Sequence, residues 1–591
     1  MTDDLLLSLP ALSASYAEGQ KPADVIREVY RRIKAVGDPA IFLHLRPISD
    51  VLAEAEALPA RGPDQPLWGA PFAVKDNIDV AGIPTTAGCP AYAYTPDADA
   101  FVIARLRAAG ALLIGKTNLD QFATGLVGVR SPYGVPRNAV DPAIVPGGSS
   151  SGSGVAVGHG LVSFSLGTDT AGSGRVPAAL NNIVGLKPSL GALSATGVVP
   201  ACRTLDTISI FAANVSDAFA VFRMACAEDP ADTYSKRLVP GGLFAPPESI
   251  RIGVPNSATR KFFGDDVQAE SFETSLARLT SLGARIVELD FTPFYDVAEM
   301  LYEGAWVAER YIVVEELMRT NRTALHPTTA AIIGVAEDLS AADAFRGMYR
   351  LKEIQKETSA LMDAIDMLCV PTIPTFYSLE DLAADPVTPN ANLGTYTNFV
   401  NLLDMCGIAV PSAPRSDGRP GSITLLGPCG TDALLASLAL AFEGNRTGAA
   451  RLPRSTAAEE VALAVCGAHM SGMALNQELT SRGGRFLKAT RTAPRYRLFA
   501  LAGGPPARPG LLRADKGAQI ELEVWSLPKT SVGDFLSGIP APLAIGTVLL
   551  EDGTTAQGFL VENAGLEGAE DITHLGGWRA FLEAQSAVSA L

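Results

Sequence analysis

The chain has 591 residues, of which 47% are hydrophobic and 19% charged, with 63 acidic against 47 basic side chains and a net charge of −16. This length exceeds what one ordinary domain holds and therefore predicts more than one domain. The acidic balance argues against a general nucleic-acid-binding surface.

The cysteines and the apolar runs indicate where such a protein works. The seven cysteines form neither a CxxC pair nor a regular framework, which favours free thiols in a reducing cytoplasm over a disulfide scaffold or a zinc site. The first residues carry acids where a secretory signal would carry bases. The longest apolar runs, such as 433–442, are shorter than the roughly 18 residues of a membrane-spanning helix. We expect a soluble cytoplasmic protein with no nucleic-acid or membrane partner.

The first 215 residues alternate between helical and strand patterns, which is typical of an α/β core. Helical patterns cover 22–60 and Ala98–Ala109, and a helical turn begins at Asn118. The strand patterns, some of them running into loops, are Leu67–Asn77, Ala111–Gly115, Leu193–Pro200 and Ile208–Ala213.

The same alternation continues to residue 442. Strands are predicted at Ile250–Val254, Ala284–Leu289, Met367–Pro371 and Ser422–Leu426. Helices are predicted at Val267–Leu282, 295–320, 340–365, Thr397–Leu403 and Thr431–Phe442.

A change of composition separates the last part of the chain. Glu443–Ala458 is polar and contains Gly and Pro, which predicts a linker. Beyond it, apolar or alternating runs at Arg495–Leu501, Gln519–Leu527 and Leu543–Leu550 lie between Gly, Pro and Asp turns. We therefore expect one domain over 1–455 and a smaller β-rich domain over 461–591.

The run from Pro146 to Pro177 points to chemistry at a carbonyl group. Two Gly/Ser loops, 147–154 and 168–174, flank an apolar segment that a flexible linker would not contain. Such loops bring hydroxyls and backbone N–H groups close together, as a nucleophile and an oxyanion hole require. Lys75 follows the apolar run 71–74, where burial would favour the neutral amine, which can accept a proton.

Lys75, the GGSS loop and the run GTDTAGSGRVPA together resemble the amidase signature family, over about residues 20–450. The resemblance implies an α/β fold with a mixed central sheet flanked by helices, a Ser-cisSer-Lys triad, and no cofactor or metal. It assigns Ser173 as the nucleophile, Ser149 as the bridging serine and Lys75 as the base. It further implies that Thr170, Ala171 and Gly172 form the oxyanion hole and that Asp169 and Arg175 brace the loop.

Further segments are similar to allophanate hydrolases within that family: TNFVNLLDMCGIAVP at 397–411, GAHMSGMALN at 467–476 and EDITHLGGWRAFL at 570–582. The implied substrate, allophanate, carries a carboxylate, which the resemblance places against Tyr302 and Arg310, with Gly125 lining the same pocket. On one helix, eight residues give about 80° of separation, so Tyr302 and Arg310 can face one cavity. An ion pair of Arg310 with Glu309 or Glu303 is the alternative.

The C-terminal part resembles gamma-glutamylcyclotransferase-type domains, a small α+β fold rich in strands. In allophanate hydrolases this extension is implied to remove carbon dioxide from N-carboxycarbamate, the first product. His469 is the candidate acid or base here, and a structural histidine is the alternative. A histidine common in the segment LNHQL of relatives is Gln477 in this chain, which weakens a mechanism based on that position.

Several other functions remain open at this point. The chain could hydrolyse another small amide, act as the glutaminase subunit of a tRNA-dependent amidotransferase, or be a scaffold without activity. Gly148–Gly152 also matches GxSxG, which would make Ser150 the nucleophile and require a later Asp and His. The resemblance further implies a homodimer and a functional link to a biotin-dependent urea carboxylase, in the breakdown of urea or of s-triazines.

Overall fold

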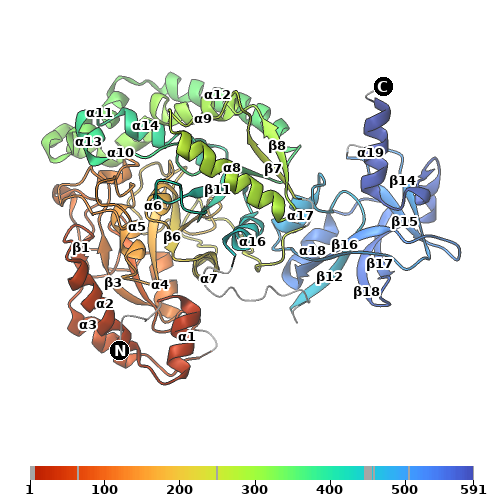
Figure 1. Cartoon of the computed structure of the whole chain (residues 1–591), viewed down its shortest axis with the longest axis horizontal. Coiled ribbons are helices and arrows are strands. Elements are labelled where there is room, and N and C mark those ends of the chain that lie inside the picture. Colours follow the sequence, from red (N-terminus) through yellow and green to blue (C-terminus); the bar gives the residue numbers. More distant parts are fainter. Residues whose placement is uncertain are drawn as a thin grey trace.

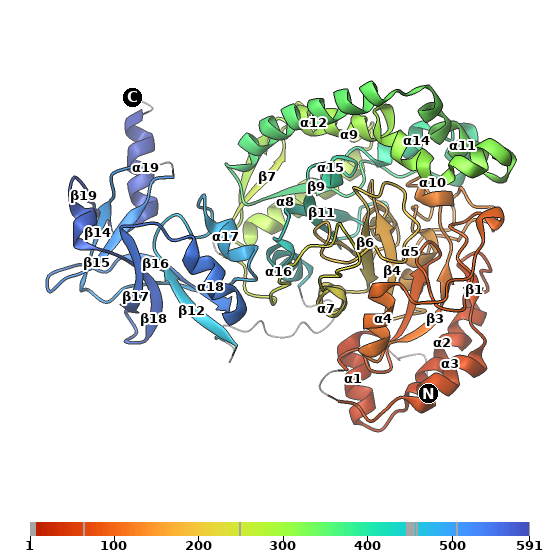
Figure 2. The ribbon, with the colours of Figure 1, turned by 180° about the vertical axis from the view of Figure 1, so that it is seen from behind.

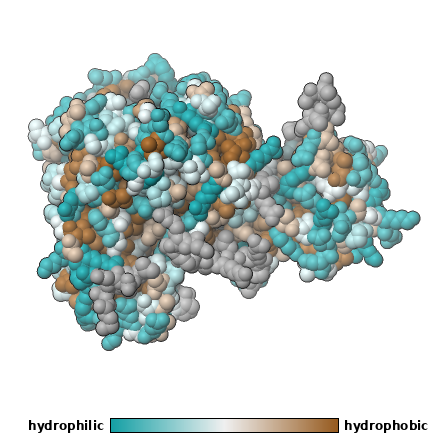
Figure 3. Space-filling model, in the orientation of Figure 1, coloured by the Kyte–Doolittle hydropathy of each residue, from teal (hydrophilic) through white to brown (hydrophobic). Residues whose placement is uncertain are grey.

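The computed structural model describes residues 7–62, 65–247, 250–444, 456, 459–503 and 506–589. Figure 1 shows a large lobe built from residues up to 444 and a smaller lobe, coloured blue, built from residues after 459. The helices of the large lobe surround its sheet, as the view from behind also shows (Figure 2). Figure 3 shows mostly hydrophilic side chains on one face of both lobes, with apolar patches among them.

The large lobe is built around one mixed sheet of eleven strands, in the order β1-β3-β2-β4-β6-β5-β10-β11-β9-β7-β8. The strands are β1 (Phe42–Leu45), β2 (Pro71–Lys75), β3 (Leu112–Thr117), β4 (Phe164–Asp169), β5 (Val184–Lys187), β6 (Thr207–Ala212), β7 (Arg251–Pro255), β8 (Arg285–Leu289), β9 (Met367–Pro371), β10 (Met405–Pro411) and β11 (Ser422–Pro428). All residues of β2, β3 and β4 are buried, which explains their continuous apolar runs. The predicted α/β fold with a mixed central sheet is confirmed.

Sixteen α-helices flank this sheet within the described residues. They are α1 (Leu9–Ala17), α2 (Pro22–Val36), α3 (Ile48–Ala57), α4 (Phe101–Ala108), α5 (Ser151–Gly158), α6 (Val176–Leu180), α7 (Val215–Ala225), α8 (Asp266–Ser281), α9 (Thr292–Glu303), α10 (Trp306–Thr320), α11 (Pro327–Gly334), α12 (Ala341–Met362), α13 (Leu379–Ala384), α14 (Thr388–Leu393), α15 (Phe399–Leu402) and α16 (Asp432–Glu443). Their ends follow local rules. Pro22 begins α2 and Gly37, with φ of 59°, ends it, while Ser340 and Asp343 form a capping box at α12.

Three predictions about this lobe are wrong. The helical stretch 22–60 is interrupted by β1, an edge strand that pairs antiparallel with β3. The single helix over 295–320 is two helices, α9 and α10, because Gly304 leaves the helical conformation with ψ of −170°. Within 193–200 the structure has no strand, and only Val198 forms an isolated bridge, to Ile78.

The smaller lobe is rich in strands, as predicted. It contains a five-stranded sheet in the order β13-β16-β12-β18-β17 and a three-stranded sheet in the order β15-β14-β19. Its elements are β12 (Glu460–Val465), α17 (Asn476–Thr480), β13 (Arg485–Arg491), β14 (Tyr496–Ala500), β15 (Pro509–Arg513), β16 (Glu521–Pro528), α18 (Lys529–Ser537), β17 (Leu543–Leu549), β18 (Thr555–Val561), β19 (Glu570–Asp571) and α19 (Trp578–Ser589). Of the predicted linker, Glu443 ends α16, and 445–455 and 457–458 lie outside the described residues.

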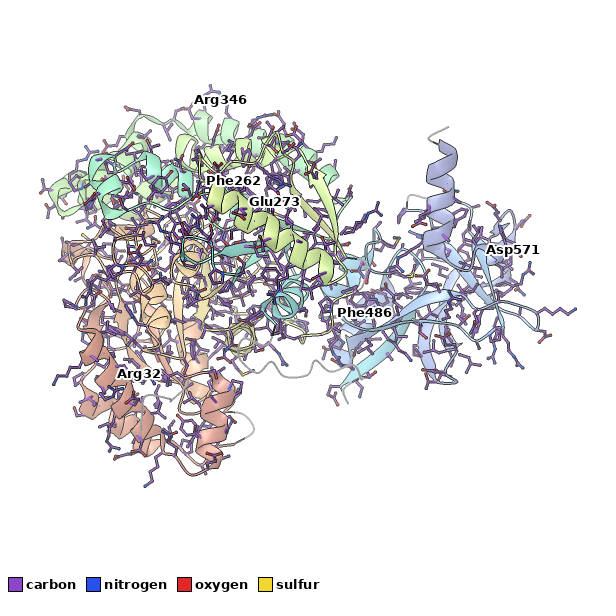
Figure 4. All side chains as sticks on the ribbon, viewed as in Figure 1. Arg32, Phe262, Glu273, Arg346, Phe486 and Asp571 are labelled. Atoms are coloured by element: carbon purple, nitrogen blue, oxygen red, sulfur yellow. The ribbon has the colours of Figure 1, made fainter. Side chains whose placement is uncertain are left out.

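The two lobes share apolar contacts. The buried ring of Phe244, from the large lobe, lies 6.1 Å from the ring of Trp525 in β16. Trp525 also contacts Phe486, which Figure 4 labels on the side of the small lobe that faces the large one. One cluster of buried side chains therefore extends through both lobes.

This shared cluster predicts that Phe244→Ala destabilises the protein by about 3 kcal/mol, because truncating a buried Phe leaves a cavity. Phe263→Ala is the matched control, since Phe263 is 50% exposed. Scanning calorimetry of both variants checks the prediction. An unchanged melting temperature in the Phe244 variant would show that the contact between the lobes contributes nothing to stability.

Candidate active site

The predicted catalytic side chains meet at the carboxyl ends of two neighbouring strands. β2 and β4 run parallel and are paired, so Lys75 at the end of β2 lies beside Thr168 near the end of β4. Ser149 comes from the loop before α5, and Ser173 from the loop before α6. Three segments, around residues 75, 149 and 168–173, thus converge at one edge of the sheet.

A chain of hydrogen bonds joins these groups. Lys75 Nζ lies 2.8 Å from Ser149 Oγ and 2.7 Å from Thr168 Oγ1. Ser149 Oγ lies 2.9 Å from Ser173 Oγ. The Gly148–Ser149 peptide bond is cis, as the resemblance implies. A proton can therefore pass from Ser173 to Lys75 through Ser149 without any large movement.

Burial lowers the pKa of Lys75 from 10.5 to about 7. The amine is fully buried, and no described carboxylate lies within 4.0 Å of it. Asp120, Asp206 and Asp169 are close enough to oppose the shift, but desolvation is the larger effect. Near neutral pH a large fraction of Lys75 is consequently an uncharged amine, which is the form that accepts a proton.

Asp169 and Arg175 form the predicted ion pair. Arg175 Nε and Nη2 each donate to a carboxylate oxygen of Asp169 at 2.9 Å, and both side chains are fully buried. Burial would raise the pKa of Asp169, but the Arg175 guanidinium holds it below its usual value. Asp169 also accepts the backbone N–H groups of Gly172 and Gly174, at 3.0 Å each, and so fixes the loop around Ser173.

The hydrogen bond of the Gly172 N–H group bears on the predicted oxyanion hole, which stays a prediction. Its N–H group already donates to Asp169 and is not available for an oxyanion in this structure. Within the described part of the chain we find no acceptor for the backbone N–H groups of Thr170, Ala171 and Ser173, all of which are buried. These three amides are the better candidates, since buried donors normally have partners.

Arg310 and Tyr302 are in contact, although they lie on different helices. The Arg310 guanidinium carbon is 5.1 Å from the centre of the Tyr302 ring, and Nη2 is 3.5 Å from the Tyr302 hydroxyl. The helical-wheel argument for this contact is wrong, because α9 ends before α10 begins.

Arg310 is also tied to the loop around the nucleophile. Its Nη1 donates to Ala123 O at 3.4 Å and to Thr124 Oγ1 at 3.3 Å. The carbonyl oxygen of the next residue, Gly125, lies 3.5 Å from Ser173 Oγ. The structure therefore brings Gly125, Arg310 and Ser173, the predicted nucleophile, to one site.

The alternative ion pairs of Arg310 are not found among the described side chains. Glu309 instead accepts from the backbone N–H and the hydroxyl of Thr204, at 2.7 Å each. The side chain of Glu303 lies outside the described ones. Arg310 is 1% exposed and its Nε has no described partner, so its positive charge is buried without a salt bridge among the described side chains, while Asp206 and Glu309 act on it from farther away.

Ser150 does not have the surroundings of a nucleophile elbow. Its hydroxyl bonds to Thr168 O at 3.2 Å, and no histidine among the described residues bonds to it. The described residues also contain no group of three or more His, Cys, Asp and Glu side chains that could hold a metal ion.

In the small lobe, His469 lies in a polar and aromatic pocket. Its Nε2 is 3.0 Å from Glu478 Oε2, and its ring stacks on Phe559 at 5.1 Å. Burial lowers the pKa of His469, and the charge of Glu478 acts in the opposite direction. The cavity here has a volume of about 110 Å³ and also includes Arg508. Gln477 lines a different cavity, of about 770 Å³, which residues of both lobes enclose.

The sequence reasoning missed three groups around the relay. Thr168 accepts a hydrogen bond from Lys75. It belongs to the motif GTDTAGSGRVPA, and its position there, next to Asp169, could have indicated a role in the site. Asp206 accepts the hydroxyl of Thr170, and Asp120 lies so near Gly148 that a Cβ there would be 2.1 Å from its Oδ2. Nothing in the sequence near these two aspartates marks them, because only the fold brings them to the site.

A mixed sheet with a lysine–serine–serine relay at the carboxyl ends of its parallel strands is the arrangement of a serine-type amide hydrolase. Comparison with known proteins agrees with this class. Residues 24–436 match the family model of amidases, and residues 461–583 match that of the allophanate hydrolase C-terminal domain.

The solved structure of allophanate hydrolase from Kluyveromyces lactis superposes on this chain with a TM-score of 0.74 and is 40% identical in sequence. The match covers 98% of this chain and 99% of the other. Urea amidolyase of Saccharomyces cerevisiae is 44% identical over 88% of this chain. The matched part is only 30% of the length of the urea amidolyase. A glutamyl-tRNA(Gln) amidotransferase subunit of Nitratidesulfovibrio vulgaris is 34% identical over 73% of this chain and 95% of its own. The chain belongs to the amidase family and, within it, to the allophanate hydrolases.

No helix in the described part of the chain is both long and apolar enough to cross a membrane.

The lowered pKa of Lys75 predicts how the reactivity of Ser173 depends on pH. Below about pH 7 the amine is protonated and cannot accept a proton, so labelling of Ser173 by a fluorophosphonate should slow about tenfold per pH unit. Above that pH the rate should be constant. Labelling rates between pH 5 and 10, followed by mass spectrometry, check this.

Lys75→Met should abolish the labelling, because Met has a similar length and no base. Lys352→Met makes the same substitution at an exposed position and should label like the wild type. Circular dichroism verifies that both variants are folded. A midpoint near pH 10, or normal labelling of the Lys75 variant, would contradict the role of Lys75.

Proposed function

We propose that the protein hydrolyses allophanate to ammonia and N-carboxycarbamate through an acyl-enzyme on Ser173. The observation that carries the proposal is the pairing of the Lys75–Ser149–Ser173 relay with a buried guanidinium, that of Arg310, which has no carboxylate partner among the described side chains. The relay fits amide hydrolysis, and the unmatched charge fits an amide that carries a carboxylate.

In the first step Ser173 Oγ attacks the carbonyl carbon of the terminal amide. Its proton moves to Ser149 as the Ser149 proton moves to Lys75 Nζ. The backbone N–H groups of Thr170, Ala171 and Ser173 are the proposed donors to the oxyanion, supported by their burial without described acceptors.

The relay then runs in reverse and protonates the leaving nitrogen, so that the C–N bond breaks and ammonia departs. Water attacks the remaining ester on Ser173 with the same relay as base, and N-carboxycarbamate leaves. Arg310 and Tyr302 hold the carboxylate throughout, and Gly125 lines the pocket beside the nucleophile.

We propose that the small lobe acts on that product, releasing carbon dioxide and a second ammonia, with His469 as acid or base. The support is the His469–Glu478 pair beside Arg508 in a cavity that a small anion can enter. Residues 1–455 and 461–591 are the proposed domains. A fold like that of gamma-glutamylcyclotransferase-type domains stays a prediction for the second.

The biological setting is proposed on the same basis. The similarity to urea amidolyases supports a role in urea breakdown and a functional link to a biotin-dependent urea carboxylase. The free cysteines support a cytoplasmic location. A homodimer remains a prediction.

Ser173→Ala should lower ammonia release from allophanate by at least about a thousandfold, because it removes the nucleophile. Ser163→Ala is the matched control, since Ser163 is also buried and lies outside the relay. Glutamine, assayed in parallel, tests the amidotransferase alternative. Full activity of the Ser173 variant, or turnover of glutamine without turnover of allophanate, would overturn the proposal.

His469→Ala should leave the first ammonia unchanged and slow the second, together with carbon dioxide, by about 100- to 10,000-fold, as expected for loss of an acid–base group. Stopped-flow detection of both products from one turnover separates the steps. His574→Ala, an exposed histidine of the same lobe, is the control. If both ammonia molecules are released at wild-type rates by the His469 variant, the histidine has a structural role only.

A further inference from the structure

Two buried guanidinium groups enclose residues 123–125, the segment that touches the nucleophile. Arg310 donates to Ala123 O and Thr124 Oγ1 from one side. Arg130 donates from Nη1 to Thr124 O at 3.0 Å, and from Nη2 to Pro386 O at 2.9 Å. Both arginines are 1% exposed. A single residue, Thr124, therefore bridges two positive charges inside the protein.

Among the described side chains neither guanidinium forms a salt bridge, although the charges of Asp120 and Asp206 act on Arg130 and Arg310, respectively, from farther away. Among the described side chains no carboxylate lies within 4.0 Å of either guanidinium, and the buried Nε of each lacks a hydrogen-bond partner. Asp120 is the nearest acid along the chain, but its two oxygens accept the backbone N–H groups of Gly128 at 2.9 Å and of Arg130 itself at 2.8 Å. Buried charges in proteins are normally paired or bind a ligand.

Arg130 also lies beside Gly125, the residue whose carbonyl group contacts Ser173. Its Nη1 lies 3.2 Å from the point where a Cβ of Gly125 would be, and the Gly125 carbonyl lies 3.5 Å from Ser173 Oγ. A side chain at 125 is excluded, since its Cβ would lie 2.6 Å from Asp120 Oδ2. The absence of that side chain leaves the guanidinium close to the substrate pocket.

We propose that Arg130 is a second guanidinium of the carboxylate-binding site and acts with Arg310 to select carboxylated amides. This rests on the proposed function. One carboxylate has enough lone pairs to accept hydrogen bonds from two guanidinium groups. Two cations also suit the course of the reaction, because the bound species changes from the allophanate monoanion to the N-carboxycarbamate dianion. The second positive charge therefore stabilises the dianion that forms later in the reaction more than the monoanion that binds first.

Two substrates that differ at one group separate this role from a structural one. Malonamate has CH₂ in place of the NH of allophanate and keeps the carboxylate, whereas malonamide has an amide in place of that carboxylate. Arg130→Gln should lower kcat/KM for malonamate about 10- to 100-fold, through kcat as well as KM, as expected for loss of a hydrogen bond to a charged group that forms further negative charge. For malonamide the change should be within about threefold.

Arg130→Lys is the second variant. An ammonium keeps the charge but lacks the planar fork, so we expect a smaller loss that is still selective for malonamate. Arg137→Gln is the matched control, because Arg137 lies half-exposed in the same loop region. Thermal melting of each variant shows whether it folds.

An equal loss on both amides would show that Arg130 only braces residues 123–125, and an unchanged kcat/KM on both would show that it has no role. Either result overturns the inference. The wild type tests the proposed function separately: a wild-type enzyme that prefers malonamide would overturn the carboxylated substrate, whatever the Arg130 variants do.

Discussion

The site depends on keeping one amine out of water. Lys75 Nζ is fully buried, and its hydrogen bonds go to the hydroxyls of Ser149 and Thr168. Desolvation acts against the ammonium form, while more distant carboxylates limit the shift to a pKa of about 7. A closer carboxylate would fix the proton on the amine, and a more exposed site would restore the ordinary pKa of lysine. The sheet provides the balance, because β2 lies between β3 and β4 and is buried throughout.

Whereas Lys75 is buried without a close charged partner, the loop that carries Ser173 is held by a buried ion pair. Asp169 and Arg175 are buried together and satisfy each other with two hydrogen bonds, and Asp169 uses its remaining acceptor sites on the Gly172 and Gly174 amides. Removing either partner would leave an uncompensated buried charge, which typically costs about 3–5 kcal/mol. A second anchor is Asn401, whose Nδ2 donates to Asp169 O at 2.8 Å. The loop is thus rigid before substrate arrives, as stabilisation of an oxyanion requires.

Much of this was predictable from the sequence, for identifiable reasons. Continuous apolar runs bounded by Gly and Pro predict the buried strands, and the Gly/Ser run with Lys75 carries the family resemblance that implies the relay. Short or interrupted patterns failed. β1 has only four residues, and the strand β10, between β5 and β11, begins within two residues of the helical pattern before it. Gly304 breaks a helix in a pattern that otherwise reads as continuous.

The remaining site residues could not be derived from local patterns, because their roles come from contacts across the fold. Arg130 is 180 residues away from Arg310, and Thr124 between them joins the two only in the folded chain. Gly172 was assigned to the oxyanion hole because it stands in the right motif, whereas the direction of its N–H group is set by Asp169. Likewise Gln477 and His469, eight residues apart, face different cavities.

The most direct test of this account is the titration of Lys75 itself. The ¹³C NMR signal of lysine labelled at the ε-carbon can be followed from pH 5 to 11, and Lys75→Met identifies the signal by its loss. The account predicts a resonance that titrates with a pKa of about 7. A Lys75 signal that titrates near 10.5, the ordinary value for lysine, would contradict it, because the base of the relay would then be protonated at neutral pH.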